Sequence, residues 1–217
     1  RKYVTSGTEP IYAEHMEGFT YHGAEPSVYV EDEVCLTDWM TANLGIRYAL
    51  FLTDGKAYNR LEPRAALRFR IGPIASVKMS YTDMNQFSHR VKASYPLDIP
   101  TGFWMPSTSD IAPMHSRQYS LGAYFNFPHN IRLDVEGYYK TMDNIREYVG
   151  ITSLYPPLDK WEEEYVDGLG RSYGMETQLE WTGEKTFFSL GYTLSWSERY
   201  FPQMHDDWFY DMFDNRH

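Results

Sequence analysis

Two segments in which apolar and polar residues alternate each contain a pair of carboxylates separated by one intervening residue. The pairs are Glu31 with Glu33, and Asp134 with Glu136. In an extended strand, residues i and i+2 point to the same side, so each pair could supply the acid and the base of a glycosidase. Such pairs also form ion pairs with arginines of neighbouring strands. We favour that interpretation and expect no enzymatic activity.

An acidic segment near residue 217 could in principle hold a hard cation, which prefers carboxylate oxygens. Its spacing is irregular, so a solvated acidic loop is the better interpretation, and we predict neither a metal nor a cofactor. The sequence contains no G-x-S-x-G, no H-E-x-x-H and no glycine-rich phosphate loop. The residues concerned are His205, Asp206, Asp207, Asp211 and Asp214.

Three tryptophans, Trp104, Trp161 and Trp208, each fall in a different long segment without alternation. Exposed indole rings can stack on sugars, porphyrin-like rings or peptide side chains. The alternative is that they pack the loops against one another. Arg47 and Arg68 occupy the alternate positions of two predicted strands that carry polar residues, which we call the polar parity. We predict these five residues as ligand contacts.

The elements that would position these residues are long strands in which apolar and polar residues alternate. The sharpest is PRAALRFRI at 63–71, in which Ala65, Leu67, Phe69 and Ile71 at odd positions oppose Arg64, Ala66, Arg68 and Arg70 at even positions. This period of two is typical of strands with one apolar face. The same pattern predicts strands at 27–37, 41–53, 76–87, 117–127 and 131–144, and two strands of roughly eleven residues within 171–196.

The connections between these strands alternate between short and long. We predict short turns at 38–40, 72–75, 128–130 and 183–185, and long loops at 53–62, 88–116, 150–171 and from 202 onward. Such asymmetry is typical of up-and-down transmembrane barrels. Strands of about nine to eleven residues also suit a membrane better than the five or six residues of soluble sheets.

The placement of charges and aromatic rings supports the same interpretation. The apolar parity carries rings toward the strand ends, as interfacial girdles do. One acidic residue, Asp32, falls on the apolar parity, which predicts an interfacial position or a β-bulge. The rings are Tyr48, Tyr81, Phe127, Tyr139, Trp181, Tyr192 and Trp196, and the cations on the polar parity are Arg47, Arg64, Arg68, Arg70, Lys78, Arg132 and Lys140.

The composition excludes several classes of protein. A net charge of -10 over 217 residues argues against nucleic-acid binding. No apolar run approaches the ~20 residues of a membrane-spanning helix, and the mean hydropathy of -0.55 is compatible with strands that are apolar at alternate positions only. The single cysteine, Cys35, excludes an intramolecular disulfide.

The sequence therefore predicts an all-β fold, an antiparallel up-and-down transmembrane β-barrel of about eight visible strands. Two alternatives stay open. One is a small closed outer-membrane barrel with a structural or adhesive role, and the other is a soluble antiparallel β binding module.

Several stretches also resemble the barrel of TonB-dependent outer-membrane transporters, in particular the Bacteroidetes type. The resemblance is carried by SVYVEDEVCLTDWMTANLGIRYALF, RLEPRAALRFRI, SVKMSYTDMNQF, PTGFWMPSTSDIAPMHSRQYSLGAYF, DVEGYYKTMDNIREYV, GRSYGMETQLEW and GYTLSWSERYF, in this order. It implies a barrel of the 22-stranded type around a plug, with extracellular loops that capture a scarce nutrient. Residues 1–217 would then be a segment of a single barrel domain, without the plug, the first strands and the last strands.

The same resemblance implies the partners and the location. We expect the rest of the receptor polypeptide, the TonB complex, outer-membrane lipid and a small-molecule, glycan or peptide ligand as partners. The expected location is the cell outer membrane.

Overall fold

The computed structural model describes residues 2–3, 11–12, 22–53, 55–92, 102–148, 165–212, 214 and 216. Eight long strands dominate this part of the chain. They are β4 (Ser27–Thr37), β5 (Met40–Thr53), β6 (Lys56–Ile71), β7 (Ala75–Gln86), β10 (Met114–Phe127), β11 (Ile131–Tyr148), β12 (Tyr165–Thr182) and β13 (Phe187–Tyr200). The short strands are β1 (Lys2–Tyr3), β2 (Ile11–Tyr12), β3 (Gly23–Ala24), β8 (Ser88–Lys92), β9 (Gly102–Pro106) and β14 (Phe209–Tyr210).

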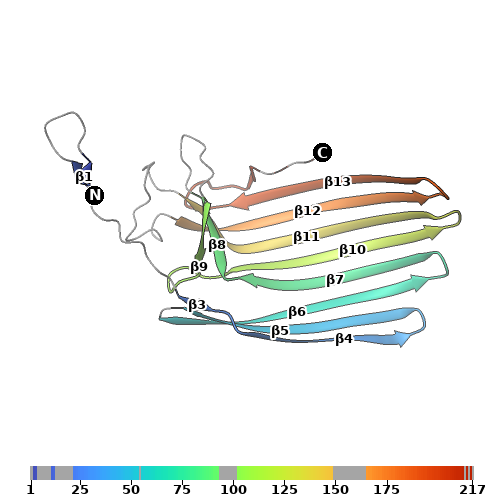
Figure 1. Cartoon of the computed structure of the whole chain (residues 1–217), viewed down its shortest axis with the longest axis horizontal. Coiled ribbons are helices and arrows are strands. Elements are labelled where there is room, and N and C mark those ends of the chain that lie inside the picture. Colours follow the sequence, from blue (N-terminus) through green and yellow to red (C-terminus); the bar gives the residue numbers. More distant parts are fainter. Residues whose placement is uncertain are drawn as a thin grey trace.

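One 10-stranded antiparallel sheet contains all eight long strands, in the order β14-β13-β12-β11-β10-β7-β6-β5-β3, with β4 beside β3 on the outer edge of β5. Within the described residues the two edges of this sheet do not pair with each other, so the strands form an open wall (Figure 1). The prediction of about eight strands of a larger sheet is confirmed. The alternative of a small closed barrel is wrong.

All four short turns lie at one end of the wall, which we call the turn end; the opposite end is the loop end (Figure 1). No helix in the described ranges is long and apolar enough to cross a membrane.

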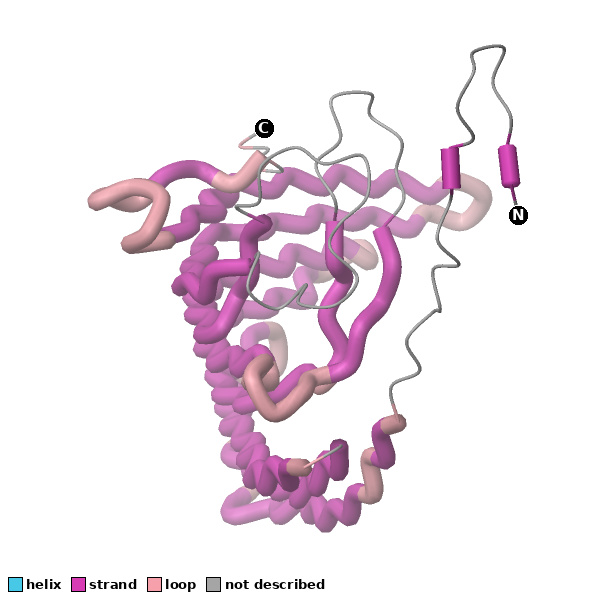
Figure 2. The backbone as a smooth tube through the Cα atoms, turned by 90° about the vertical axis from the view of Figure 1, so that its left-hand side faces the viewer, coloured by secondary structure: helices cyan, strands magenta, loops and turns pink. Residues whose placement is uncertain are grey.

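The wall is curved, and the β8–β9 hairpin lies on its inner side. Figure 2 shows the long strands as a bent wall with two further strands standing inside the bend, and Figure 1 labels β8 and β9 in front of the wall near the loop end. We call the inner side the concave face and the other side the outward face.

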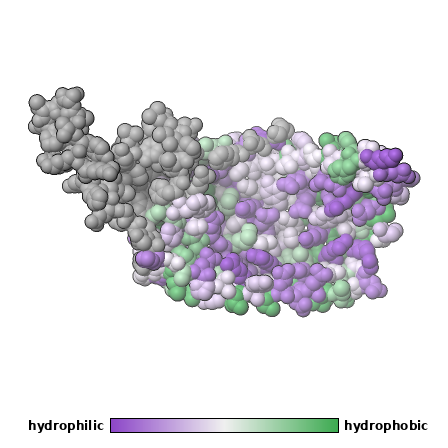
Figure 3. All heavy atoms as spheres, in the orientation of Figure 1, coloured by the Kyte–Doolittle hydropathy of each residue, from purple (hydrophilic) through white to green (hydrophobic). Residues whose placement is uncertain are grey.

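The pairing register brings the residues of each parity together on one side. Leu67 pairs with Met79, Met79 with Leu121, and Leu121 with Gly137, so the apolar residues of successive strands share the outward face. Leu121 is 57% exposed there, whereas a soluble sheet would cover such a face. The soluble β module is therefore not supported. The concave face is largely hydrophilic where it is visible (Figure 3).

Aromatic rings form a band on the outward face toward the loop end. Residues directly opposite one another across successive strands form what we call a register row. The next row toward the loop end is charged or polar, which places it outside the apolar band. The aromatic row contains Tyr81, Tyr119, Tyr139, Tyr173 and Trp196; the polar row contains Asp83, Arg117, Thr141, Arg171 and Glu198.

A second set of rings lies near the turn end. Phe127 and Trp181 both flank Ile131, and Trp181 pairs with Phe188. Phe127 lies eight residues from Tyr119, which corresponds to roughly 26 Å along the strand. This span is close to the apolar band of about 25 Å in outer-membrane barrels. Tyr192 lies between the two sets of rings rather than at an end.

The structure corrects the bounds of three predicted loops. The loop expected at 53–62 is strand: β5 reaches Thr53 and β6 begins at Lys56, so only a tight turn containing Gly55 (φ 81°) joins them. Glycine adopts this left-handed backbone without a steric penalty. The loop expected at 88–116 also contains the β8–β9 hairpin, and its last residues belong to β10. In the loop expected at 150–171, residues 165–171 belong to β12, and residues 149–164 lie outside the described residues.

Two irregularities alter the strands locally. Asn144 (φ 58°) forms a bulge in β11 between Asp143 and Ile145. A second irregularity lies between Cys35 and Thr37 in β4. Neither moves Asp32, which pairs with Leu44 and stays on the outward face of an edge strand.

Candidate functional site

A small apolar core lies on the concave face at the loop end, away from the middle of the wall. Its buried members are Ala49, Phe51, Tyr58 and Phe87, with Ala112 packed against them. Phe51 and Phe87 stack with ring centroids 5.0 Å apart. The core forms because the strands continue past the outward apolar band, so their inner side chains can pack against the chain between β7 and β10.

Hydrogen bonds from β6 and β11 hold the segment that follows the hairpin. The Tyr58 hydroxyl donates to the carbonyl of Thr108 at 2.7 Å, and Asn144 Nδ2 donates to the carbonyl of Pro113 at 3.0 Å. Lys56 Nζ donates to the carbonyl of Ser109 at 3.1 Å. The bulge at Asn144 therefore has a role, since it directs a polar side chain at this segment.

A buried histidine lies at the base of the hairpin. His89 Nε2 is 2.9 Å from the Ser107 hydroxyl, and the imidazole is 4% exposed. Burial, reinforced by the positive charge of Arg146, lowers the pKa of His89 to about 4. The hairpin is thus held by a neutral imidazole at physiological pH.

The three predicted tryptophans have different environments. Trp104 lies on β9 with 62% of its surface exposed, on the concave side of the wall. Trp208 stacks on Tyr200 with centroids 5.6 Å apart and lies 4.2 Å from the Arg171 guanidinium. Arg171 and Tyr200 share the outward parity, so Trp208 packs against side chains of β12 and β13. Trp161 lies outside the described residues.

Arg47 helps to close a gap between β6 and β7. The β6–β7 ladder ends at the pair Arg64 and Thr82, whereas β6 stays paired with β5 as far as Lys56. Pro63 comes next on β6 and has no N–H with which to continue the ladder.

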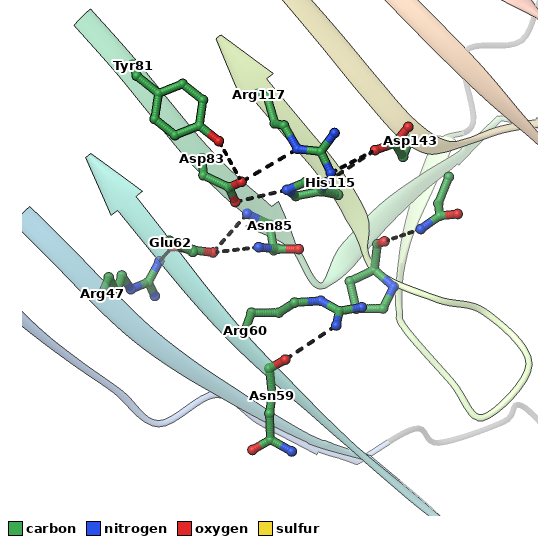
Figure 4. Close-up of polar contacts among 12 residues, drawn as sticks. Arg47, Asn59, Arg60, Glu62, Tyr81, Asp83, Asn85, His115, Arg117 and Asp143 are labelled. Carbon is green, nitrogen blue, oxygen red and sulfur yellow. Dashed lines mark hydrogen bonds and ion pairs between the residues drawn. The ribbon is translucent and has the colours of Figure 1, made fainter. Parts of the chain in front are cut away.

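Beyond this point a buried carboxylate takes the place of the backbone pairing (Figure 4). The carboxylate belongs to Glu62, which is 1% exposed. Its Oε1 accepts hydrogen bonds from the backbone N–H of Asn85 at 2.8 Å and from Asn85 Nδ2 at 3.3 Å. Its Oε2 accepts Arg47 Nη1 at 3.3 Å, and Arg47 Nη2 also reaches Glu25 at 3.0 Å. We call Arg47, Glu62 and Asn85 the seam.

Next to the seam, a histidine lies between two carboxylates. His115 Nε2 is 2.9 Å from Asp83, and its Nδ1 is 3.2 Å from Asp143 (Figure 4). Arg117 lies near the same two carboxylates, at 3.8 and 3.9 Å. The cluster borders a cavity of about 260 Å³ together with Arg60 and Asn144.

Arg68 lies far from the hairpin, in a concavity of about 800 Å³ near the turn end. Arg64, Lys78, Glu31 and Glu33 also line it. The predicted ligand contacts therefore do not form one cluster. Trp104 is at the loop end, Arg47 is in the seam and Arg68 lies toward the turn end.

The paired carboxylates have polar partners. Glu31 accepts Asn43 Nδ2 at 3.0 Å, Asp134 pairs with Arg132 at 2.6 Å, and Glu136 accepts the Tyr124 hydroxyl at 2.7 Å. Only the Asp134–Arg132 contact is an ion pair, and both residues belong to β11, whereas the ion-pair interpretation expects arginines of neighbouring strands. Across the described residues, no group of three or more His, Cys, Asp or Glu side chains could hold a metal ion.

Sequence reasoning did not identify Glu62, Asp83, His115 or Asp143. A signal for part of this set exists in the pattern. Asp83, His115 and Asp143 occupy the apolar parity of their strands beyond the last aromatic residue, so they mark the point where the apolar band ends. Glu62 precedes a proline in a strand, where a lost ladder bond needs another acceptor.

Comparison with known proteins agrees with this architecture. A family model described as TonB dependent receptor-like, beta-barrel, matches residues 4–215. Among solved structures, the fold is similar to that of the alcaligin outer membrane receptor FauA from Bordetella pertussis, with a TM-score of 0.54 and 15% sequence identity. The similarity covers 82% of this chain and 30% of FauA, so the chain spans less than a third of that receptor. No curated protein matches the sequence.

Proposed function

Because the chain belongs to the TonB-dependent receptor β-barrel family, we propose that it is a wall segment of an active transporter that captures a scarce nutrient. The family places the chain in the cell outer membrane. It is a receptor family and not an enzyme family. The Bacteroidetes type stays a prediction from the sequence.

In this proposal residues 1–217 are a segment of a single barrel domain, and the plug and the remaining strands belong to the rest of the receptor polypeptide. Energy reaches the plug from the TonB complex, and the extracellular loops bind a small-molecule, glycan or peptide ligand. By the asymmetry of such barrels, the turn end faces the periplasm and the loop end faces the exterior.

The observation that carries this proposal is the position of the β8–β9 hairpin. It lies on the concave side at the loop end (Figures 1 and 2), and its strand β9 carries Trp104, whose surface is 62% exposed. An aromatic ring on a hairpin fixed by a small core is suited to stacking on a ligand, because little order is lost on binding.

The remaining predicted contacts keep separate roles. We propose Arg68 as a polar contact along the inner path, and Trp161 stays a prediction. Arg47 holds the seam and would orient the wall near a ligand. Trp208 is packed against Tyr200 and Arg171, which favours a structural role at the loop end of the wall.

Growth of cells that carry the full-length receptor tests this function. Receptor-deficient cells are complemented with wild type, with Trp104→Ala or with Trp39→Ala, a control at the turn end. Iron chelates, glycans and peptides are supplied in turn as the limiting nutrient, with and without TonB. We expect one nutrient class to require both the receptor and TonB, and Trp104→Ala to weaken its uptake while Trp39→Ala does not. Equal growth of deficient and complemented cells on every nutrient would refute the proposal.

A further inference from the structure

The cavity of about 260 Å³ beside the seam is lined mainly from the outward face of the wall, and we call it the outward cavity. It forms where the β6–β7 ladder has ended, because the two strands no longer fill the space between them. The hairpin with Trp104 lies on the other side of the wall (Figure 2). The lining residues on the outward parity are Leu61, Asp83, Asn85, His115 and Asp143, and Arg60 and Asn144 complete the cavity.

The outward cavity lies just beyond the aromatic row, toward the loop end. Asp83 and Asn85 lie two and four residues beyond Tyr81 on β7, which corresponds to roughly 7 and 13 Å along the strand. Rings such as Tyr81 mark the boundary of the hydrocarbon core, and polar head groups extend about 5 to 7 Å beyond that core on each side. The cavity therefore lies at the height of lipid head groups and just beyond it.

Two polar groups that line the cavity lack full partners. Asn85 Oδ1 is buried and has no hydrogen-bond partner among the described residues. The orientation of this amide is fixed, because its Nδ2 donates to the Glu62 carboxylate, which can only accept. The Arg60 guanidinium donates to the carbonyl of Asn59 at 3.3 Å and forms no ion pair within the described ranges (Figure 4). A ligand that both donates and accepts hydrogen bonds would satisfy both groups.

The full charges around the cavity balance, which favours a neutral ligand. Asp83 and Asp143 lie 3.8 and 3.9 Å from Arg117, and His115 lies between the two carboxylates (Figure 4). Arg60 adds a second guanidinium. Two carboxylates and two guanidiniums leave little net attraction for an anion or a cation. Each carboxylate still has lone pairs for further donors, since it can accept about four hydrogen bonds.

We propose that the outward cavity binds one neutral sugar ring through its hydroxyl groups. Hydroxyl groups donate to Asn85 Oδ1 and to Asp143, and they accept from Arg60, because a hydroxyl is both a donor and an acceptor. The Tyr81 hydroxyl donates to Asp83 at 3.3 Å, so its ring lies next to the cavity on the membrane side and offers apolar surface to the sugar. A volume of about 260 Å³ is smaller than the sites of drug-sized ligands, which suits a single ring.

A sugar at this height has two sources, a lipid head group and a free saccharide. The inference uses the outer-membrane location that the family gives and does not depend on which nutrient is imported. The site is also separate from the hairpin, which lies on the concave side.

Binding of defined sugars to the full-length receptor in phosphatidylcholine vesicles tests the proposal. Methyl glycosides of glucose, galactose and mannose are the free probes, octyl glycosides of the same sugars are the lipid-linked probes, and glucose 6-phosphate is the charged comparison. Hydrogen exchange of residues 83–87 and 115–117 reports occupancy. We expect at least one neutral sugar to slow this exchange, by about tenfold at a concentration ten times its Kd, and glucose 6-phosphate to have a smaller effect.

The two groups of probes distinguish the sources. Slower exchange with octyl glycosides alone assigns the site to a lipid head group, and slower exchange with methyl glycosides as well assigns it to a free saccharide. Unchanged exchange with all six neutral probes, or a larger effect of glucose 6-phosphate than of methyl glucoside, would overturn the proposal.

Variants of the full-length receptor locate the binding. Asp143→Asn keeps the shape of the side chain but removes the charged acceptor, and we expect the Kd of the bound sugar to rise about tenfold. Leu61→Trp fills the cavity and should abolish binding. Leu52→Trp, on the outward parity of β5 and outside the cavity, is the matched control. The mobility of unheated receptor in gels confirms that each barrel is folded.

Wild-type binding by Leu61→Trp, or equal losses of binding in Leu61→Trp and Leu52→Trp, would refute this location. Nutrient uptake is scored separately in the same receptors. A receptor that binds the sugar and transports nothing contradicts the proposed function and leaves this inference intact, whereas a receptor that transports normally and binds no sugar refutes this inference alone.

Discussion

Replacement of Glu62 by alanine should open the wall between β6 and β7 at the loop end. Glu62 is almost fully buried and accepts two hydrogen bonds from Asn85 and one from Arg47. Alanine removes all three acceptor contacts. The backbone N–H of Asn85 has no β6 carbonyl as its acceptor, because the β6–β7 ladder ends at Arg64 and Thr82. It therefore loses its acceptor when Glu62 is removed.

The magnitude follows from these contacts. Removal of one member of a buried ion pair costs about 3 to 5 kcal/mol. Arg47 is partly exposed and keeps Glu25 and Ser27 as partners, so its contribution is smaller. We therefore expect a loss of about 3 kcal/mol for Glu62→Ala, and about 1.5 kcal/mol for Glu62→Gln, which keeps an amide oxygen for the Asn85 N–H.

Two measurements on the full-length receptor in lipid vesicles check this estimate. Denaturant unfolding gives the change in stability, and hydrogen exchange of residues 83–87 reports local opening. Exchange there should become about a hundredfold faster in Glu62→Ala, since 1.4 kcal/mol corresponds to a factor of ten. Glu31→Ala, an exposed carboxylate on the same face, should stay within about 0.5 kcal/mol of wild type. Equal exchange in Glu62→Ala and wild type would refute the seam.

Three further predictions concern other parts of the wall. Folding holds the pKa of His89 near 4, below its ordinary value of 6.5. The contribution of the neutral imidazole to stability is therefore complete above pH 6.5 and is lost as the pH falls toward 4. Hydrogen exchange of the hairpin should rise over that range in wild type, and a His89→Gln receptor should lack this pH dependence. Gly168→Ala places a methyl group against the Phe201 ring and should cost about 1 to 3 kcal/mol in denaturant unfolding, whereas Gly191→Ala, which meets open space, should be neutral. Leu121→Arg puts a charge in the outward apolar band and should lower the stability measured by refolding into vesicles by about 2 to 4 kcal/mol. Asn126→Arg, on the concave face, should have a much smaller effect. Equal losses of stability in the two variants would contradict the assignment of the two faces.

The alternation of side chains predicts the part of the fold that meets two solvents. Leu67 and Arg68 differ in environment because one faces outward and the other faces the concavity, and the register of the remaining strands follows from the same rule. The four short turns are also predicted correctly, because turn residues separate the alternating segments.

The pattern fails where both faces of a strand leave the apolar band. Lys56–Leu61 reads as a loop because polar residues occupy both parities, yet it is strand that continues beyond the band and packs Tyr58 inward. The seam could not be predicted either, since a glutamate before a proline does not reveal which backbone N–H it will accept. The bulge at Asn144 depends on contacts with Pro113, 31 residues away in the sequence.

The aromatic residues also give the inclination of the strands. The aromatic row that ends at Trp196 on β13 includes Ala65 on β6. Tyr48 on β5 pairs with Leu61, so it lies four residues along the strand from this row. This offset is roughly 13 Å along the strands over six inter-strand spacings of about 4.8 Å, which corresponds to an angle on the order of 25°. The membrane surface therefore crosses the wall obliquely, so Tyr48 and Trp196 can anchor at one depth although they belong to different rows.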